Sequence, residues 1–306
     1  MMNARQPTSL FAPESAPADS PSATAAQYRR QGYHIARQIV PRALIDRVFA
    51  DMHRLAAQQL GRLGLPASQG ETAEAVHGDL RQLFARDLPA YLATLTLCAK
   101  LVSLYELYLH PNIRAFAESV GVGFPVFQTA PVMHVMSKSL KVPGGYQGFG
   151  SHQDWPTLQG SLDTVTVWIP FVDVDRDRFT LEIVPGSHTG GLYPYARRDH
   201  IFEVDPAHYD AEGFVPVEAA RGDVVFMSSF AVHRSGTRGD ERLRVATSMR
   251  YENAAEPHFI ERSYPFAHKR SVVGQLITPD FPTPAQVRRV FEAPDQAAAG
   301  GSKRPS

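Results

Sequence analysis

The chain has 306 residues, enough for one large domain or two small ones with a substantial buried core. Its 31 basic side chains balance its 31 acidic ones, so net charge gives no broad attraction to nucleic acid or to an anionic membrane surface. The single cysteine, Cys98, excludes an internal disulfide, and no apolar run approaches the roughly 20 residues that span a bilayer, so we expect a cytoplasmic protein.

The N-terminal part of the chain is predicted to be mainly helical. Residues 1–25 are rich in Ala, Ser and Pro and lack the apolar core of a signal peptide, which predicts a disordered tail. Apolar side chains at helical spacing and flanking Pro and Gly then predict a helical region over 41–122. The predicted helices cover residues 41–61, 71–86, 88–108 and 111–120. The segment 88–108 is the most apolar, and we expect it to be the most deeply buried.

The sequence pattern changes after Gly123, where short apolar, β-branched runs such as "TVTVWIPF" and "DVVFM" alternate with Pro and Gly. Many strands without intervening helices predict a β-sandwich, jelly roll or barrel over about residues 124–255. We therefore expect a single α+β domain over 26–290, with a mainly β core, the helices packed on its outside and a C-terminal extension at 256–290. Residues 291–306 are predicted to form a second disordered tail.

Three His-x-Asp pairs occur in the sequence, although roughly one is expected by chance. The pair that begins at His77 lies in a predicted helix, where positions i and i+2 point to different sides. The pair that begins at His208 lies in a polar loop, and we interpret both as accidental. His152 and Asp154 differ because residues i and i+2 of an extended segment point to the same face and can bind one ion together.

A third metal ligand is predicted at His233, in another β segment. Two imidazoles and one carboxylate form a facial triad that leaves one side of an octahedral ion open, which suits non-heme Fe(II). Zinc could use the same ligands. The residues alone leave this choice of metal open.

The segment "ERLRVATSMRY" alternates, so that Arg242, Arg244 and Arg250 share one face of the predicted strand. An arginine inside a barrel needs an anion, and bidentate pairing with a carboxylate is its natural use. We expect this role for Arg244. For Arg242 and Arg250 we weigh a salt bridge at the surface or in a hairpin, with Asp240 or Glu241, more heavily.

The order of these motifs resembles the phytanoyl-CoA dioxygenase family of Fe(II)- and 2-oxoglutarate-dependent oxygenases. The resemblance covers about residues 26–255 and rests on His152-x-Asp154, "LEIVPGSH" at 181–188, "RGDVVFMSSFAVHRSG" around His233, and Arg244 eleven residues later. It implies a double-stranded β-helix, a jelly-roll or cupin-like fold, with His152, Asp154 and His233 holding Fe(II).

The resemblance also implies a site for the co-substrate. Arg244 would hold the far carboxylate of 2-oxoglutarate, helped by the Ser235 hydroxyl, with Trp168 beside it. With O2, the enzyme would hydroxylate an unactivated C–H bond and convert 2-oxoglutarate to succinate and CO2. Because related halogenases have a small residue in place of the carboxylate ligand, Asp154 favours hydroxylation or desaturation over halogenation.

The substrate is predicted to be a polar, sugar-like small molecule, with no nucleic acid or membrane as a partner. This hypothesis rests on amide and aromatic side chains around the predicted metal site, namely Tyr146, Gln147, Gln153, Trp155 and Gln159. Two alternatives remain open. One is a zinc-type hydrolase that uses Glu182 or Asp163 as its base, and the other is a non-catalytic cupin-like binding module.

Overall fold

A computed structural model describes residues 21–142, 148–198, 201–265 and 279–292 of the chain. The predicted tails, apart from the few residues noted below, and the candidate substrate residues Tyr146 and Gln147 lie outside these ranges. The described helices are α1 (Pro21–Gln31), α2 (Arg42–Arg62), α3 (Ala73–Arg86), α4 (Leu88–Cys98), α5 (Val102–Tyr108), α6 (Pro111–Ser119), α7 (Trp155–Leu158), α8 (Pro257–Glu261) and α9 (Pro284–Val290).

The helices largely follow the predicted segments, with two differences. Helix α1 begins at Pro21, so the last residues of the predicted tail, 21–25, are helical. The predicted helix over 88–108 is broken into α4 and α5, although it has, as expected, the largest share of buried residues among the four predicted helices. Its apolar side chains point outward at Leu92, Leu97 and Val102, of which Val102 is 73% exposed. Apolar content alone could not show which face of this segment packs on the core.

The strands form antiparallel sheets. They are β1 (Tyr33–Ala36), β2 (Pro125–Val126), β3 (Val132–Met136), β4 (Val165–Pro170), β5 (Leu181–Ile183), β6 (Tyr195–Arg198), β7 (Ile201–Val204), β8 (Val215–Val217), β9 (Val224–Ser228), β10 (His233–Ser235) and β11 (Arg244–Asn253). The large sheet has the order β1-β9-β4-β11-β2, with β3 also paired to β11. A second sheet has the order β10-β5-β8, and β6 pairs with β7.

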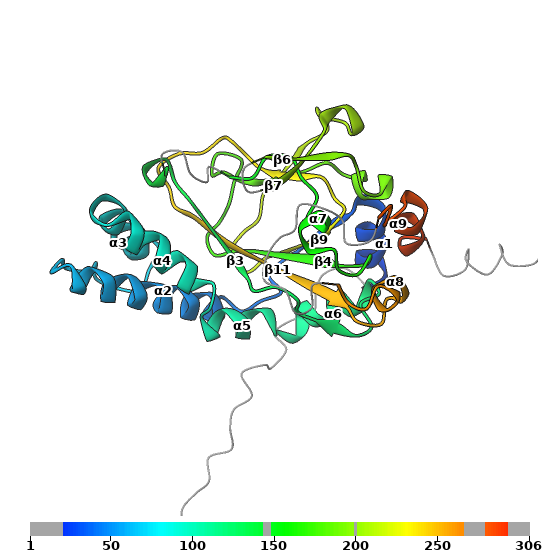
Figure 1. Ribbon diagram of the computed structural model, residues 1–306. Coiled ribbons are helices and arrows are strands. Elements are labelled where there is room, and N and C mark those ends of the chain that lie inside the picture. The colour runs from blue at the N-terminus through cyan, green and yellow to red at the C-terminus, as the bar shows by residue number, and fades with distance from the viewer. Residues whose placement is uncertain (1–20, 143–147, 199–200, 266–278, 293–306) are drawn as a thin grey trace, which may run out of the picture.

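The N-terminal helices pack on the outside of the large sheet, as predicted. Figure 1 shows α2 to α5 along one side of the β core, with α1, α8 and α9 gathered at the other end. The Phe49 ring of α2 meets Phe171 at 5.8 Å, and the Tyr108 hydroxyl of α5 bonds Thr247 Oγ1 of β11 at 3.1 Å. One continuous set of buried apolar side chains joins these helices to the sheet. The free cysteine, Cys98, is buried in it.

The C-terminal segment makes a second, smaller core against α7 and the residues around it. Trp155, Phe230 and Phe281 pack there with Leu162 and Val287. Arg262 donates to the carbonyl oxygens of Gln159 and Gly160 and lies over the Phe281 ring at 4.1 Å. Phe291, the first residue of the predicted C-terminal tail, instead packs edge-on against His188 and so belongs to the fold.

Within the described residues, no single helix has the length and apolar composition needed to cross a membrane. The bent pair α4 and α5 meets that test only when the two helices are taken together.

Candidate metal centre

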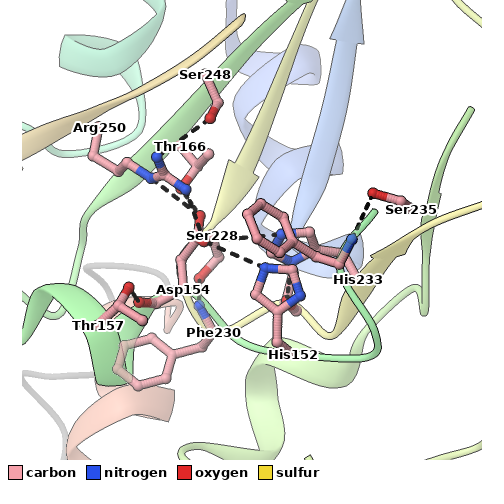
Figure 2. A network of polar contacts seen from close by, with 12 residues as sticks. His152, Asp154, Thr157, Thr166, Ser228, Phe230, His233, Ser235, Ser248 and Arg250 are labelled. Carbon is pink, nitrogen blue, oxygen red and sulfur yellow. Dashed lines mark hydrogen bonds and ion pairs between the residues drawn. The ribbon is translucent and has the colours of Figure 1, made fainter. Parts of the chain in front are cut away.

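His152 and His233 lie directly opposite each other on neighbouring extended segments. The amide of His152 donates to the His233 carbonyl at 2.9 Å, and the amide of His233 returns a bond to the His152 carbonyl at 3.0 Å. Cross-strand partners point to the same face of a sheet, so the two imidazoles lie together with their centroids 4.1 Å apart. These two histidines, which are far apart in the sequence, are therefore neighbours in the fold, as Figure 2 shows.

Asp154 completes the cluster. Its Oδ1 lies 3.7 Å from Nε2 of His152 and 3.9 Å from Nε2 of His233. Each residue offers one ligand atom, and these three atoms lie within 4.8 Å of one another. All three side chains are buried, at 3% to 5% exposure. In the described part of the chain, no other group of His, Cys, Asp and Glu side chains converges in this way.

The hydrogen bonds of the two histidines suit them to bind a metal. Nδ1 of His152 lies 2.8 Å from the Gly150 carbonyl, and Nδ1 of His233 lies 3.0 Å from the Ala231 carbonyl. A carbonyl can only accept, so each Nδ1 carries the proton and each Nε2 keeps its lone pair for an ion. Burial and the neighbouring His233 lower the pKa of His152 to about 3, and burial also lowers that of His233, so both rings are neutral.

The carboxylate of Asp154 is held by two further side chains. Thr166 Oγ1 donates to Oδ2 at 2.8 Å, and Arg250 donates through Nη2 to Oδ1 at 2.8 Å and through Nε to Oδ2 at 3.2 Å. Burial by itself would raise the pKa of Asp154, but the charge of Arg250 outweighs it, with help from the two imidazoles once they are protonated at low pH, and the pKa lies well below its usual range. The site therefore presents a carboxylate and two neutral imidazoles, which are the donors that Fe(II) and similar ions use.

The predicted co-substrate residues Trp168, Ser235 and Arg244 lie on strands β4, β10 and β11. Arg244 is 2% exposed at the start of β11, its Nε donates to the Phe179 carbonyl at 3.0 Å, and its guanidinium lies 5.9 Å from the Trp168 ring. Ser235 is the third residue of β10, and its hydroxyl accepts a hydrogen bond from the Phe149 amide at 3.1 Å. Arg244 and Trp168 are thus neighbours on the sheet that carries Thr166.

Those predicted substrate residues that the structure describes, Gln153, Trp155 and Gln159, occupy buried positions. Gln153 is fully buried; its Nε2 donates to the carbonyls of Gly191 and Phe230, and its Oε1 accepts from the Tyr193 amide. Trp155 stacks on Phe230 with centroids 5.6 Å apart. Gln159 is 1% exposed and ends α7 in the left-handed region, at φ 48°. These contacts argue against a role in substrate binding, because the side chains are engaged within the fold.

The residues weighed for other roles lie elsewhere. Glu182 forms an ion pair with Arg234 at 2.6 Å, and Asp163 accepts a hydrogen bond from the side-chain amide of Asn253 at 2.6 Å. Neither predicted hydrolase base therefore belongs to the His-Asp-His cluster. Of the other two His-x-Asp pairs, Asp79 contacts His53, and His208 lies 4.0 Å from Asp205 and is about half exposed. The interpretation of those pairs as accidental agrees with this placement.

Arg250 was missed as a site residue by the sequence reasoning. Arg242 pairs with Asp240 and Asp175 at the surface, as expected of a hairpin arginine, whereas Arg250 reaches Asp154 instead. The available signal was the alternation of β11, which places Arg250 on the same face as Arg244. Sequence spacing could not show which acidic side chain that face meets.

A pocket of about 770 Å³ adjoins the segments that carry the two histidines. Its walls include Ser151 and Arg234, which are next to His152 and His233 in the chain, and Glu203, which pairs with His152 across the backbone. Further polar walls come from Tyr195, Asp205, Tyr209 and Glu212.

The family model of phytanoyl-CoA dioxygenase (PhyH) matches residues 28–246, which is more than half of the chain and includes the cluster and Arg244. The chain belongs to the phytanoyl-CoA dioxygenase family. The family predicted from the order of the motifs is thereby confirmed.

Two curated proteins are similar to this phytanoyl-CoA dioxygenase family member. Methylphosphonate hydroxylase of Gimesia maris is 29% identical over 140 residues, 46% of this chain and 52% of that protein. Phytanoyl-CoA dioxygenase 1 of Oryza sativa subsp. japonica is 33% identical over 100 residues, 31% of this chain and 36% of that protein. The matched region spans about half of the first relative and about a third of the second.

Solved structures support a shared fold. The non-heme alpha ketoglutarate dependent epimerase SnoN from nogalamycin biosynthesis matches with a TM-score of 0.51 at 21% identity, over 76% of this chain and 83% of that one. The non-heme monooxygenase ThoJ matches with a TM-score of 0.52 at 16% identity, over 75% and 77% of the two chains. Identities this low relate this family member to them by fold alone.

Proposed function

We propose that the protein is an Fe(II)- and 2-oxoglutarate-dependent dioxygenase that hydroxylates an unactivated C–H bond of a small molecule. The observation that carries this proposal is the buried cluster of His152, Asp154 and His233 in a chain of the phytanoyl-CoA dioxygenase family. We also propose that its antiparallel sheets form a double-stranded β-helix, a fold supported by the order of the strands and by the similarity to SnoN and ThoJ.

The donor set fits Fe(II), since two neutral imidazole nitrogens and one carboxylate oxygen can occupy one face of an octahedral ion. His152, His233 and Asp154 would hold the metal, and the bound iron would supply the activation of O2. The protein's own contribution is to keep each Nε2 free of a proton, through the carbonyls of Gly150 and Ala231, and to keep Asp154 ionised.

Arg244 is the proposed partner of the far carboxylate of 2-oxoglutarate. The guanidinium is planar and can bind a carboxylate through two parallel hydrogen bonds, which fixes both the position and the orientation of the co-substrate. Burial strengthens such a pair, and Arg244 is among the largest fully buried side chains. Trp168, close to the guanidinium, would exclude water from this end of the site, and Ser235 would contribute its hydroxyl.

The substrate is proposed to be a polar, sugar-like small molecule. The support now comes from the pocket next to the histidine segments, whose walls carry Tyr195, Tyr209, Asp205 and Glu212, rather than from Gln153, Trp155 and Gln159. The names of the two curated relatives point to unlike substrates, so the family does not decide the question. Turnover of long-chain acyl-CoA without turnover of any sugar or sugar nucleotide would contradict this choice.

The decisive experiment is anaerobic addition of Fe(II) and 2-oxoglutarate to the purified protein. We expect a weak visible charge-transfer band, followed by release of succinate when O2 is admitted. A His152→Ala variant should give neither. A zinc hydrolase or a non-catalytic binding module would give no band and no succinate above this control, and that result would overturn the proposal.

A further inference from the structure

Arg250 binds the carboxylate of Asp154 through two of its nitrogens. Nη2 lies 2.8 Å from Oδ1, Nε lies 3.2 Å from Oδ2, and Nη1 bonds Ser248 Oγ at 3.2 Å. The side chain is 12% exposed and its Asp154 partner 4%. A bidentate pair between buried groups fixes the plane of the carboxylate as well as its distance.

Arg250 and Thr166 form a cross-strand pair behind Asp154. They are directly opposite in the register of β11 and β4, and both donate to Oδ2. Two strands of the large sheet therefore hold the same oxygen from adjacent positions, as Figure 2 shows. Such support on rigid strands gives a more precise orientation than a loop residue could give.

The guanidinium itself is held in place. Ser248 lies two residues before Arg250 on the same face of β11, and its hydroxyl accepts from Nη1. That hydroxyl lies 2.9 Å from Nε2 of His134 on β3, so its own proton can be donated to the imidazole. The chain of contacts runs from β3 through β11 to Asp154 and leaves Arg250 little freedom to turn away.

This arrangement leaves Oδ1 directed at the two imidazoles. Oδ2 is engaged by two donors, while Oδ1 accepts one bond from Arg250 and is the atom nearest both Nε2 atoms. A carboxylate oxygen has two lone-pair positions, so Oδ1 can accept from Arg250 and still bind an ion.

We propose that Arg250 is a positioning residue that, together with Thr166, holds the Asp154 carboxylate with Oδ1 turned toward the metal. This inference rests on the proposed function, because it assigns Asp154 to a bound metal. It predicts that loss of the guanidinium weakens metal binding even though Arg250 is not itself a ligand.

The test measures the affinity of the full chain for Co(II) in the absence of 2-oxoglutarate, by equilibrium dialysis, together with the visible spectrum of the bound Co(II). The variants are Arg250→Gln, Arg250→Lys and Thr166→Val, with Arg242→Gln as the matched control. Arg242 lies near the same strand but pairs with Asp240 and Asp175 at the surface. Thermal unfolding of the metal-free proteins identifies any variant that fails to fold.

Supporting residues around a metal ligand typically change its metal affinity about 10- to 100-fold when removed. We expect Arg250→Gln to lose metal affinity by this factor and to show a shifted Co(II) spectrum. Arg250→Lys should recover part of the affinity, because lysine restores the positive charge but not the two parallel hydrogen bonds of the guanidinium. Thr166→Val, which keeps the side-chain shape, should lose roughly 5-fold. If Arg250→Gln does not fold, the Thr166→Val and Arg250→Lys results decide the proposal by the same criteria.

Two outcomes would overturn the inference. Unchanged affinity and spectrum in the folded variants would show that Asp154 is oriented without Arg250. Tighter binding in Arg250→Gln would show that the guanidinium competes with the metal for Asp154. In both cases the wild-type chain binds Co(II) and the proposed function survives, whereas failure of the wild type and of Arg242→Gln to bind Co(II) would overturn the two proposals together.

Discussion

The backbones of His152 and His233 exchange two hydrogen bonds, of 2.9 and 3.0 Å, and this pairing brings the two imidazoles to one side of neighbouring strands. We predict that His152→Ala and His233→Ala each reduce Fe(II) affinity and succinate formation by at least about 100-fold, because each removes a ligand and not merely a supporting group. Metal content after dialysis and a succinate assay measure the two effects.

The control for these variants is His208→Ala, which changes a half-exposed histidine of another His-x-Asp pair. It should leave both readouts within twofold of the wild type. Equal metal loss in His208→Ala would mean that the dialysed metal had been bound at the surface.

Arg244 is predicted to set the affinity for 2-oxoglutarate. Hydrogen bonds between charged groups contribute roughly 1.5 to 3 kcal/mol, so Arg244→Met should raise the dissociation constant of 2-oxoglutarate about 10- to 100-fold. The metal ligands remain intact, and Co(II) affinity without 2-oxoglutarate should change little. Titration of the anaerobic charge-transfer band gives the constant directly.

Arg242→Met provides the comparison for Arg244→Met, since it removes an arginine two residues earlier that pairs only with exposed acids. Exposed ion pairs contribute little, so the 2-oxoglutarate constant should stay near that of the wild type. Equal effects of the two variants would assign the change to general electrostatics and not to a specific carboxylate site.

The sequence was most informative where a short spacing fixed the geometry. His152 and Asp154 do meet in one cluster, but Asp154 is not extended as predicted: it has right-handed helical backbone angles at the start of α7. The alternation of β11 correctly placed Arg244 in the interior. The partner of Arg250 could not be predicted in this way, since Asp154 is 96 residues away, at the start of α7, and their meeting depends on the tertiary fold.

The same limit explains the outcomes for Gln153 and for α4 and α5. A glutamine beside a metal ligand can face a substrate or the protein interior, and the partners of Gln153 are backbone groups of distant loops that leave no mark in the sequence. An apolar helix predicts burial, yet only the packing of the neighbouring helices decides which of its faces is covered, and Leu92 and Leu97 lie on the face left open.

Gln153 is predicted to act on stability and not on substrate recognition. Its amide bonds the Gly191 and Phe230 carbonyls and the Tyr193 amide, all at 2.9 Å or less. Gln153→Ala would leave these buried groups without partners, which costs roughly 2 to 4 kcal/mol in the free energy of unfolding. Urea unfolding measures this loss.

The corresponding activity measurement separates the two roles of Gln153. The measurement is made without urea, where both proteins are folded. Under these conditions Gln153→Ala should have a KM for the substrate that is close to that of the wild type. A large rise in KM with unchanged stability would restore the original interpretation of Gln153 as a substrate contact.

Glu252 is predicted to make the protein less stable as the pH rises. This carboxyl group is completely buried beside Ser161 and Thr164, and burial raises its pKa from 4.5 to about 7, although hydrogen bonds from these residues and the charge of Arg250 act in the opposite direction. Asp163 lies nearby and its negative charge adds to the rise. The folded state therefore holds a proton on Glu252 over a pH range in which the unfolded chain has lost it.

Where the folded state binds more protons, stability falls with increasing pH. The contribution of Glu252 is fully present below about pH 4.5 and is lost as the pH passes about 7, with an upper limit on the order of 3 kcal/mol from the two pKa values. Glu252→Gln keeps the acceptor oxygen for Ser161 and Thr164 but cannot ionise. Urea unfolding at pH 5 and pH 8 should therefore show a smaller loss of stability in Glu252→Gln than in the wild type, and equal losses in the two proteins would mean that Glu252 does not titrate in this range.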